Sequence, residues 1–285
     1  MSSRILPEFD LLVPQSIPEA VEMLGKHQTK AAVMAGGTDL LVLMKAGLQS
    51  EYVLSLSEVP GLDYVIYDPQ DGLRVGAMAT LSQVAENADV KKYYPALWQS
   101  ACVNGTPQTR NKATVVGNIL RASPAGDCCV AALALGGKVV LQGAAGKREV
   151  DIDNFWVAYR TTARQAFEFA VEYKIPANVG KSAFIRMTRV DQDLAKLNAA
   201  VCLNMAGNIC QGARLAVGCV APTTVRVQKA EELVKGKEIN ESVLIEVAAA
   251  VGAEVTPIDD VRSSAWYRKE VSGVLVKRTI EKACA

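Results

Sequence analysis

The chain has 285 residues, of which 50% are apolar and 21% are charged, and its net charge is +1. This is the composition of an ordinary globular protein with material for about two domains. The balanced charge argues against nucleic acid or an anionic membrane as partner, and no run reaches the roughly 18 apolar residues of a membrane helix. Residues 1–9 contain no basic segment followed by an apolar one, so we expect no signal peptide and a cytoplasmic location.

Seven cysteines and a single histidine restrict the chemistry of the chain. No two cysteines form a CxxC pair, which argues against a zinc site or an iron–sulfur cluster. The odd number of cysteines argues against a disulfide framework, so buried free thiols are expected. With only His27, a histidine-based triad or a multi-histidine metal site is hard to build. We therefore predict no metal ligands, and much of hydrolase chemistry is excluded.

Strands and helices are expected to alternate along the first half of the chain. The segment 17–27 (IPEAVEMLGKH) has apolar residues at helical spacing and predicts a short helix. The apolar run 31–35 ends at two glycines and predicts a buried strand. The polar stretch 104–126 is too long for an idle loop. Further strands are predicted at 52–56, 64–67 and 73–77, and helices at 39–46, from Thr80 onward and at 96–103.

The second half of the chain continues the same alternation after an apolar helix at 128–135. The segment 176–182 (PANVGKS) is the best candidate for a domain boundary, with a first domain of residues 1–178 and a second of 179–285. The pattern predicts an α/β fold with a second, smaller α/β unit. The remaining strands are predicted at 138–142, 167–175, 199–206 and 213–220, and helices at 227–234, 241–251 and 264–283.

Residues 35–39 (AGGTD) lie between a predicted strand and a predicted helix. Two glycines let the backbone approach a ligand closely, and the N–H groups at a helix start form, with the Thr38 hydroxyl, an anion site that suits a pyrophosphate. A tight turn without a ligand explains the loop equally well. The loop is neither GxGxxG nor GxxxxGK[ST], so neither a Rossmann nor a P-loop site is predicted.

A second loop, residues 114–118 (TVVGN) followed by 123–127 (SPAGD), has the same character. It combines small residues, a hydroxyl and a glycine with a carboxylate before an apolar helix. Asp127 either caps that helix or accepts hydrogen bonds from sugar hydroxyls. Two such loops in one domain suit a dinucleotide with two phosphates better than either loop alone.

The ordered set of motifs now resembles a known family. AGGTDLL (35–41), PQTRNKATVVGN (107–118), SPAGD and ALALGGKVVL (132–141) are followed by SAFIRMTR, LAVGCVAPTTVR and IDDVRSSAWYRKEVSGVLVKR. In this order they resemble the flavoprotein subunit of the xanthine dehydrogenase and carbon monoxide dehydrogenase family of molybdenum hydroxylases. The resemblance runs from about Leu6 to Ala283.

This resemblance implies an α/β (α+β) fold with a two-part FAD-binding domain of the PCMH type and a smaller C-terminal α/β domain with an antiparallel sheet. It implies that residues 33–39 wrap the pyrophosphate, that Thr114, Val115, Gly117 and Asn118 form a second phosphate-side loop, and that Asp127 contacts the adenosine half. The family usually has glycine where Val116 stands, and many members have lysine where Arg186 stands. The implied cofactor-binding residues are Val33, Met34, Ala35, Gly36, Gly37, Thr38, Asp39, Leu40, Thr114, Val115, Val116, Gly117, Asn118, Asp127, Phe169, Phe184 and Arg186.

The resemblance also implies an electron-transfer role that needs no catalytic acid or base in this chain. In the family, a large subunit with the molybdenum cofactor oxidises the substrate. A small subunit with two [2Fe–2S] clusters then passes electrons to FAD, which hands them to an acceptor such as NAD. The implied assembly is a dimer of heterotrimers, without nucleic acid or membrane.

Other interpretations of the sequence stay open. The tail 263–277 is either partner surface or a helix packed on its own domain. A self-contained flavin reductase of related fold and an FAD-free structural subunit are the alternative functions.

Overall fold

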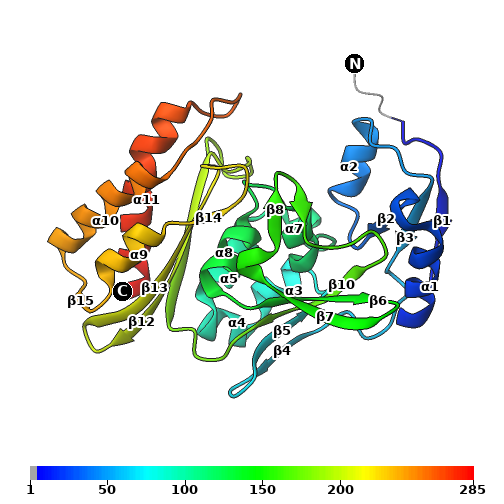
Figure 1. The fold of residues 1–285 in the computed structure, drawn as a ribbon, viewed down its shortest axis with the longest axis horizontal. Helices are drawn as coiled ribbons and strands as arrows, with labels where there is room; N and C mark the ends of the chain where they lie inside the picture. The colour runs from blue at the N-terminus through cyan, green and yellow to red at the C-terminus, as the bar shows by residue number, and fades with distance from the viewer. Residues whose placement is uncertain (1–4) are drawn as a thin grey trace.

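The computed structural model describes residues 5–285, so the first four residues of the polar N-terminal stretch lie outside it. Figure 1 shows three regions in a row. An N-terminal lobe lies at one end, a central antiparallel sheet with helices follows, and a C-terminal sheet with an outer layer of helices lies at the other end.

The N-terminal lobe contains a small parallel sheet with strand order β1-β3-β2. Its elements are β1 (Asp10–Leu12), α1 (Ile17–His27), η1 (Gln28–Lys30), β2 (Ala31–Met34), α2 (Leu40–Lys45) and β3 (Tyr52–Ser55). The side chain of Ser16 caps α1 by accepting a hydrogen bond from the Glu19 N–H, and the helix buries Ala20 and Leu24. The predicted helices and strands of this lobe are confirmed, but β1 was not predicted because three residues carry no periodic pattern.

The central region is an antiparallel sheet with strand order β4-β5-β10-β6-β7, backed by helices. Its strands are β4 (Val65–Asp68), β5 (Gly72–Gly76), β6 (Lys138–Gly143), β7 (Gly146–Asp151) and β10 (Phe169–Ile175). Its helices are α3 (Leu81–Glu86), α4 (Ala88–Tyr93), α5 (Pro95–Val103), α6 (Pro107–Arg110), α7 (Val115–Arg121) and α8 (Asp127–Leu135). Every residue of α8 is buried, which explains its almost wholly apolar sequence.

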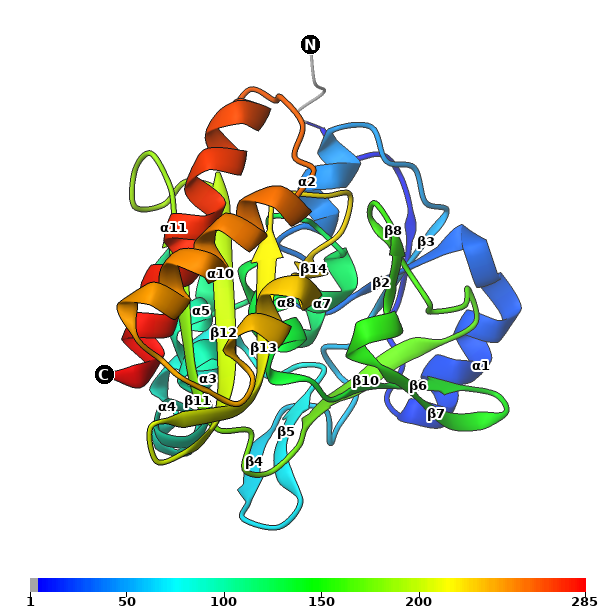
Figure 2. The same cartoon turned by 60° about the vertical axis from the view of Figure 1, so that its left-hand side comes forward.

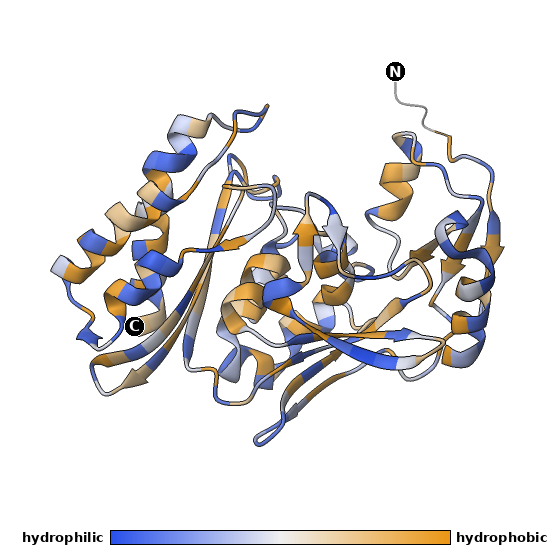
Figure 3. Cartoon of the chain, viewed as in Figure 1, coloured by the Kyte–Doolittle hydropathy of each residue, from blue (hydrophilic) through white to orange (hydrophobic). Residues whose placement is uncertain are grey.

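Four parts of the central region were not predicted, and one of them is α4, which directly follows α3. The stretch 104–126 contains the short helices α6 and α7, whose few residues are too polar or too brief to show a helical stripe. β7 is one of the two edge strands. Its charged sequence GKREVD, largely hydrophilic in Figure 3, shows no apolar alternation from which a strand could be predicted. A hairpin of β8 (Trp156–Ala158) and β9 (Thr161–Thr162) follows η2 (Ile152–Asn154) and is also short.

The C-terminal region is an antiparallel sheet with strand order β11-β12-β13-β14, and β15 pairs with β13. Its elements are β11 (Lys181–Met187), β12 (Leu197–Ala206), β13 (Ile209–Gly218), β14 (Val225–Arg226), α9 (Gln228–Val234), β15 (Lys237–Glu238), α10 (Glu241–Glu254) and α11 (Ala265–Cys284). β11 was not predicted, because it lies at the edge of the sheet and mixes polar with apolar residues. The chain changes from one sheet to the next between β10 and β11.

Helices cover both faces of the C-terminal sheet. Figure 2 shows α10 and α11 in front of the strands and α5 and α8 behind them. Successive residues of a strand point to opposite faces. Ala199 accordingly packs in the cluster under α10 and α11, and Ala200 packs in the cluster with α5 and α8. This double burial explains the continuous apolar run at 199–203 of β12, and it ties the C-terminal region to the central one.

A buried arginine fixes the loop between α10 and α11. The Arg268 side chain is 2% exposed. It donates hydrogen bonds to the carbonyl oxygens of Lys196 and Ile258 and to the Asp260 carboxylate, at 3.0, 2.7 and 2.8 Å. Arg262 binds the other oxygen of Asp260 at 2.7 Å. The loop is therefore held from inside the molecule although its apolar side chains are exposed.

In the part of the chain that the structure describes, no helix combines the length and the apolar sequence needed to cross a membrane. Five of the seven cysteines are buried and none of the seven forms a disulfide.

Candidate functional site

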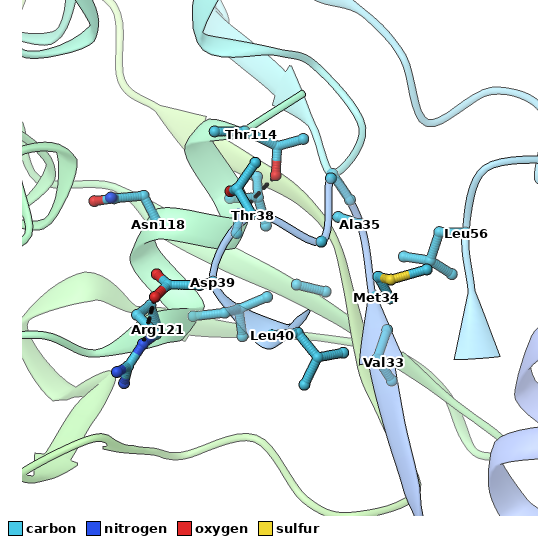
Figure 4. Close-up of a pocket in the computed structure, with 18 of the residues that line it drawn as sticks. Val33, Met34, Ala35, Thr38, Asp39, Leu40, Leu56, Thr114, Asn118 and Arg121 are labelled. Carbon is cyan, nitrogen blue, oxygen red and sulfur yellow. Dashed lines mark hydrogen bonds and ion pairs between the residues drawn. The ribbon is translucent and has the colours of Figure 1, made fainter. Parts of the chain in front are cut away.

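A cavity of about 570 Å³ lies where the N-terminal lobe meets the central helices and the β8–β9 hairpin. Its volume is within the range of small-molecule and cofactor sites. The end of β2 and the loop to α2 form one wall, and the start of α7 forms the opposite wall (Figure 4). The cavity brings together most of the predicted site residues, namely Val33, Met34, Ala35, Gly36, Gly37, Thr38, Asp39, Leu40, Thr114, Val116, Gly117, Asn118 and Phe169.

The first glycine loop is held tightly against the second. A Cβ atom added to Gly36 would lie 1.6 Å from the carbonyl oxygen of Lys112, so only glycine allows the two backbones to approach this closely. Gly37 has a φ of +71°, in the left-handed region that favours glycine. The AGGTD sequence therefore has a structural cause beyond any ligand, and the same contact fixes the two loops relative to each other.

Thr114 begins α7, so residues 115–118 of the predicted second loop are in fact the first turn of a helix. Its hydroxyl oxygen accepts a hydrogen bond from the Gly117 N–H at 3.0 Å, so this hydroxyl serves as a helix cap. Val115 and Val116 are both buried in the central core, and Val115 does not line the cavity. Val116, at the position where the resembled family usually has glycine, thus places its side chain among core residues.

Asp127 lies outside the cavity, in a buried polar cluster between the central and C-terminal regions. Its carboxylate accepts a hydrogen bond from Asn198 at 2.8 Å and pairs with Arg186 at 3.3 Å. Burial raises the pKa of Asp127 to about 6, against the lowering effects of Asn198 and Arg186. The cap of α8 is Gly126, without a side-chain hydrogen bond, so Asp127 stands one residue inside the helix and does not cap it.

Phe184 and Arg186 line a second cavity, of about 430 Å³, between α5, β11 and the end of α11. The Arg186 side chain is only 7% exposed because it faces Asp127. The structure therefore does not bring Phe184, Arg186 and Asp127 together with the glycine loops in one cavity.

Several lining residues were missed by the sequence analysis. Three of them, Asn104, Thr109 and Arg121, lie between the end of α5 and the end of α7, and the others lie on the β8–β9 hairpin or just after it. The hairpin is hydrogen-bonded to the end of α7: Trp156 Nε1 donates to the Ile119 carbonyl at 2.9 Å, and the Arg160 N–H donates to the Ala122 carbonyl at 3.2 Å. The polar run YRTTAR (159–164) carried a signal, since two cations and three hydroxyl groups stand close together. The missed polar lining residues are Asn104, Thr109, Arg121, Arg160, Thr161, Thr162 and Arg164.

The cavity is suited to binding an anion. Three arginines line it, Arg121, Arg160 and Arg164, against one acidic residue, Asp39. Among the described lining residues no cysteine, histidine, lysine or glutamate is present, so the wall offers little for acid–base or nucleophilic chemistry. Apolar side chains such as Leu43, Leu56 and Phe169 line the remainder and suit a flat ring. The arrangement indicates a binding site for an extended, phosphate-containing ligand.

Comparison with known proteins gives matches along nearly the whole chain. Residues 7–178 match the FAD binding domain in molybdopterin dehydrogenase, and residues 182–283 match the CO dehydrogenase flavoprotein C-terminal domain. The carbon monoxide dehydrogenase medium chain of Hydrogenophaga pseudoflava is 30% identical over 99% of both chains. The glyceraldehyde dehydrogenase medium chain of Sulfolobus acidocaldarius is 29% identical over 97% of this chain and 98% of its own.

A solved structure is similar over the same length. A chain of the H. pseudoflava carbon monoxide dehydrogenase that lacks the molybdenum-pyranopterin moiety superposes with a TM-score of 0.94, at 30% identity, over 98% of both chains. The three-region architecture described above is therefore the architecture of that chain.

Proposed function

Because the chain belongs to the family of FAD-binding flavoproteins of the molybdopterin dehydrogenases, we propose that it is the electron-transfer subunit of a molybdenum hydroxylase complex. In this proposal, FAD lies in the large cavity, takes electrons from the [2Fe–2S] clusters of a small partner subunit and passes them to an external acceptor such as NAD. A large subunit with the molybdenum cofactor oxidises the substrate. We further propose a dimer of such heterotrimers, and a division of this chain into an FAD-binding domain of residues 1–178 and a second domain of residues 179–285.

The lining of the cavity fits FAD. The glycine loop and the Thr38 hydroxyl suit a diphosphate, the arginines supply positive charge, and the apolar lining suits a flavin or adenine ring. When bound, FAD would serve as an electron carrier that accepts electrons one at a time and releases them as a pair. The residues of this chain bind and orient it, and the predominance of binding groups over acid–base groups in the lining agrees with this role.

We therefore propose as cofactor-binding residues those predicted residues that line the cavity. Four predicted residues do not line this cavity, and its geometry does not support them as cofactor-binding residues. Val115 is buried in the core, and Asp127, Phe184 and Arg186 lie elsewhere. The convergence of two glycine-containing loops, distant in sequence, on one arginine-lined cavity is the observation on which the proposal chiefly rests.

The first test is the cofactor content of the purified chain. We expect a yellow protein with flavin absorption, from which acid releases FAD and not FMN on chromatography. A colourless chain that takes up no added FAD would contradict the proposal and favour the structural subunit. Oxidation of an added substrate by the isolated chain would favour the self-contained flavin reductase.

A second prediction concerns assembly with the partner subunits. Ile258, Val261 and Trp266 are 73%, 98% and 71% exposed, on the loop that Arg268 holds and the helix after it. The neighbouring β11–β12 loop adds Val190 and Leu194, each 64% exposed. Large exposed apolar side chains on a fixed backbone are typical of an interaction surface. α11 packs on its own domain through its inner face, so Trp266 is free for such a contact.

We expect the double variant Val261→Ser, Trp266→Ser to co-purify with less of the partner subunits, while its FAD content and melting temperature stay unchanged. Ile245→Ser on α10 is the control, because Ile245 is 58% exposed but lies outside this surface. Equal recovery of partners with the double variant and with the control would show that the surface does not contribute to assembly.

A further inference from the structure

Arg121 is a nearly buried cation without a hydrogen bond. Its side chain is 15% exposed, and its Nε atom is buried and has no hydrogen-bond partner among the described residues. Its ion-pair partner is Asp39, whose carboxylate oxygen lies 3.2 Å from Nε, and the Asp39 side chain is 58% exposed. A guanidinium has five N–H donors, and removing it from water without hydrogen bonds costs free energy. Among the described residues the Arg121 guanidinium makes only the ion pair with Asp39, and its Nε is shielded from water.

Other shielded arginines of the chain are satisfied. Arg268 makes three hydrogen bonds, Arg186 binds the Asp127 carboxylate and the Asp191 carbonyl, and Arg214 binds the Leu133 carbonyl and both oxygens of Asp153. Buried polar groups in folded proteins nearly always have such partners. Arg121 departs from this pattern, and it does so at the wall of the large cavity.

Arg121 lies on the wall of the cavity, next to the first glycine loop. It lies on α7, one turn after Asn118, and Figure 4 shows both side chains beside Asp39 of the first glycine loop. The hairpin that carries Arg160 is hydrogen-bonded to the same helix, through Ile119 and Ala122. Arg121 and Arg160 therefore both line the cavity, on elements that are hydrogen-bonded to each other, and Arg121 contacts the first glycine loop through Asp39.

We infer that Arg121 binds a phosphoryl oxygen of the dinucleotide, and that Asp39 holds the guanidinium in place before the dinucleotide binds. This inference rests on the proposed function, since it assigns a new residue to the same site. A phosphoryl group supplies strong acceptors, so it satisfies the donors that the protein leaves without partners. Asp39 makes no capping hydrogen bond at the start of α2, which leaves its carboxylate available to orient Arg121.

Arg121 also lies in the last turn of α7, where a positive charge interacts favourably with the helix dipole. That structural role predicts a different outcome from phosphate binding. Loss of a helix-end charge lowers the stability of the chain but does not distinguish one flavin from another. Loss of a phosphate contact lowers the affinity for FAD and leaves riboflavin, which has no phosphate, unaffected.

The experiment is a titration of the flavin-free full chain and its Arg121→Gln variant with FAD, FMN, ADP and riboflavin. We expect the variant to bind FAD about 10- to 100-fold more weakly, the loss of one charge-assisted hydrogen bond or more. The ratio of FAD affinity to riboflavin affinity should fall by the same factor. A parallel loss for FMN assigns the phosphate on the flavin side, and a parallel loss for ADP assigns the one on the adenosine side.

Lys30→Gln is the matched control, because it also removes one positive charge from an ion pair with a carboxylate but lies at the surface, 62% exposed. It should leave all four affinities unchanged. Unchanged FAD affinity in Arg121→Gln, or an equal loss for FAD and riboflavin, would overturn the inference. If Arg121→Gln does not fold, Arg121→Lys keeps the charge and should show the same selective loss, more weakly. Failure of the wild-type chain to bind FAD would instead contradict the proposed function itself.

Discussion

Gly36→Val is expected to weaken FAD binding by about 100-fold or more, equivalent to roughly 3 kcal/mol. The new Cβ would meet the Lys112 carbonyl oxygen at 1.6 Å and its carbon at 2.5 Å, and both are backbone atoms that cannot rotate away. The loop at residues 35–39 must then separate from the segment before α7. Because the cavity lies between these two walls, its shape is lost together with the contact. Equilibrium titration of the flavin-free variant with FAD measures the effect.

The control for this variant is Gly25→Ala. Gly25 lies inside α1, and a Cβ added there would meet no atom within 4 Å. Alanine is favoured over glycine in a helix, so we expect this change to leave FAD binding intact and to stabilise the chain by about 0.5–1 kcal/mol. Wild-type FAD affinity in Gly36→Val would show that the close approach of the two loops is not needed for the cofactor.

Arg268→Met is expected to destabilise the chain by about 3 kcal/mol, measured by urea unfolding at neutral pH. Methionine fills similar space but donates no hydrogen bond. The carbonyl oxygens of Ile258 and Lys196 and one oxygen of Asp260 would then lose donors in a shielded site. Arg262→Met is the matched control, because Arg262 pairs with the same carboxylate but its side chain is 30% exposed. We expect this variant to lose about 1 kcal/mol of stability or less. Similar losses in the two variants would show that the burial of Arg268 has no special importance.

The effect of Arg268→Met should depend on pH. Burial alone raises the pKa of Asp260, but hydrogen bonds from Arg262, Arg268 and the Ser263 N–H outweigh burial and hold the pKa well below its usual range. A carboxylate with a lowered folded-state pKa stabilises the fold above its unfolded pKa of about 4, and this stabilisation is lost as the pH falls through the folded-state pKa. The stability difference between wild type and variant should therefore be constant from pH 5 to 7 and shrink in acid. A difference that grows in acid would contradict this assignment.

Local patterns in the sequence determined much of the fold and part of the site. The helix at 17–27, the strand at 31–35 and the helix at 128–135 were predicted because their apolar spacing and turn residues act over a few neighbouring positions. The first glycine loop was found in the same way, since two glycines between a strand and a helix are visible without knowledge of the fold. Residues 114–118, predicted as a second loop, are instead the start of α7. Elements that are short, charged or at a sheet edge, such as β7, gave no such signal.

Only the tertiary structure decided which of these residues share a cavity. Arg121 and Asp39 are 82 positions apart in the chain, and their ion pair depends on how the N-terminal lobe packs on α7. The same packing places Asp127 and Arg186 away from the glycine loops. The two residues form an ion pair with each other, between the central and the C-terminal regions. The sequence by itself determined the local conformations and the resemblance to a family. Long-range packing determined which polar groups are satisfied by the protein and which, like Arg121, remain available to a ligand, because burial and hydrogen bonding depend on neighbours in space and not along the chain.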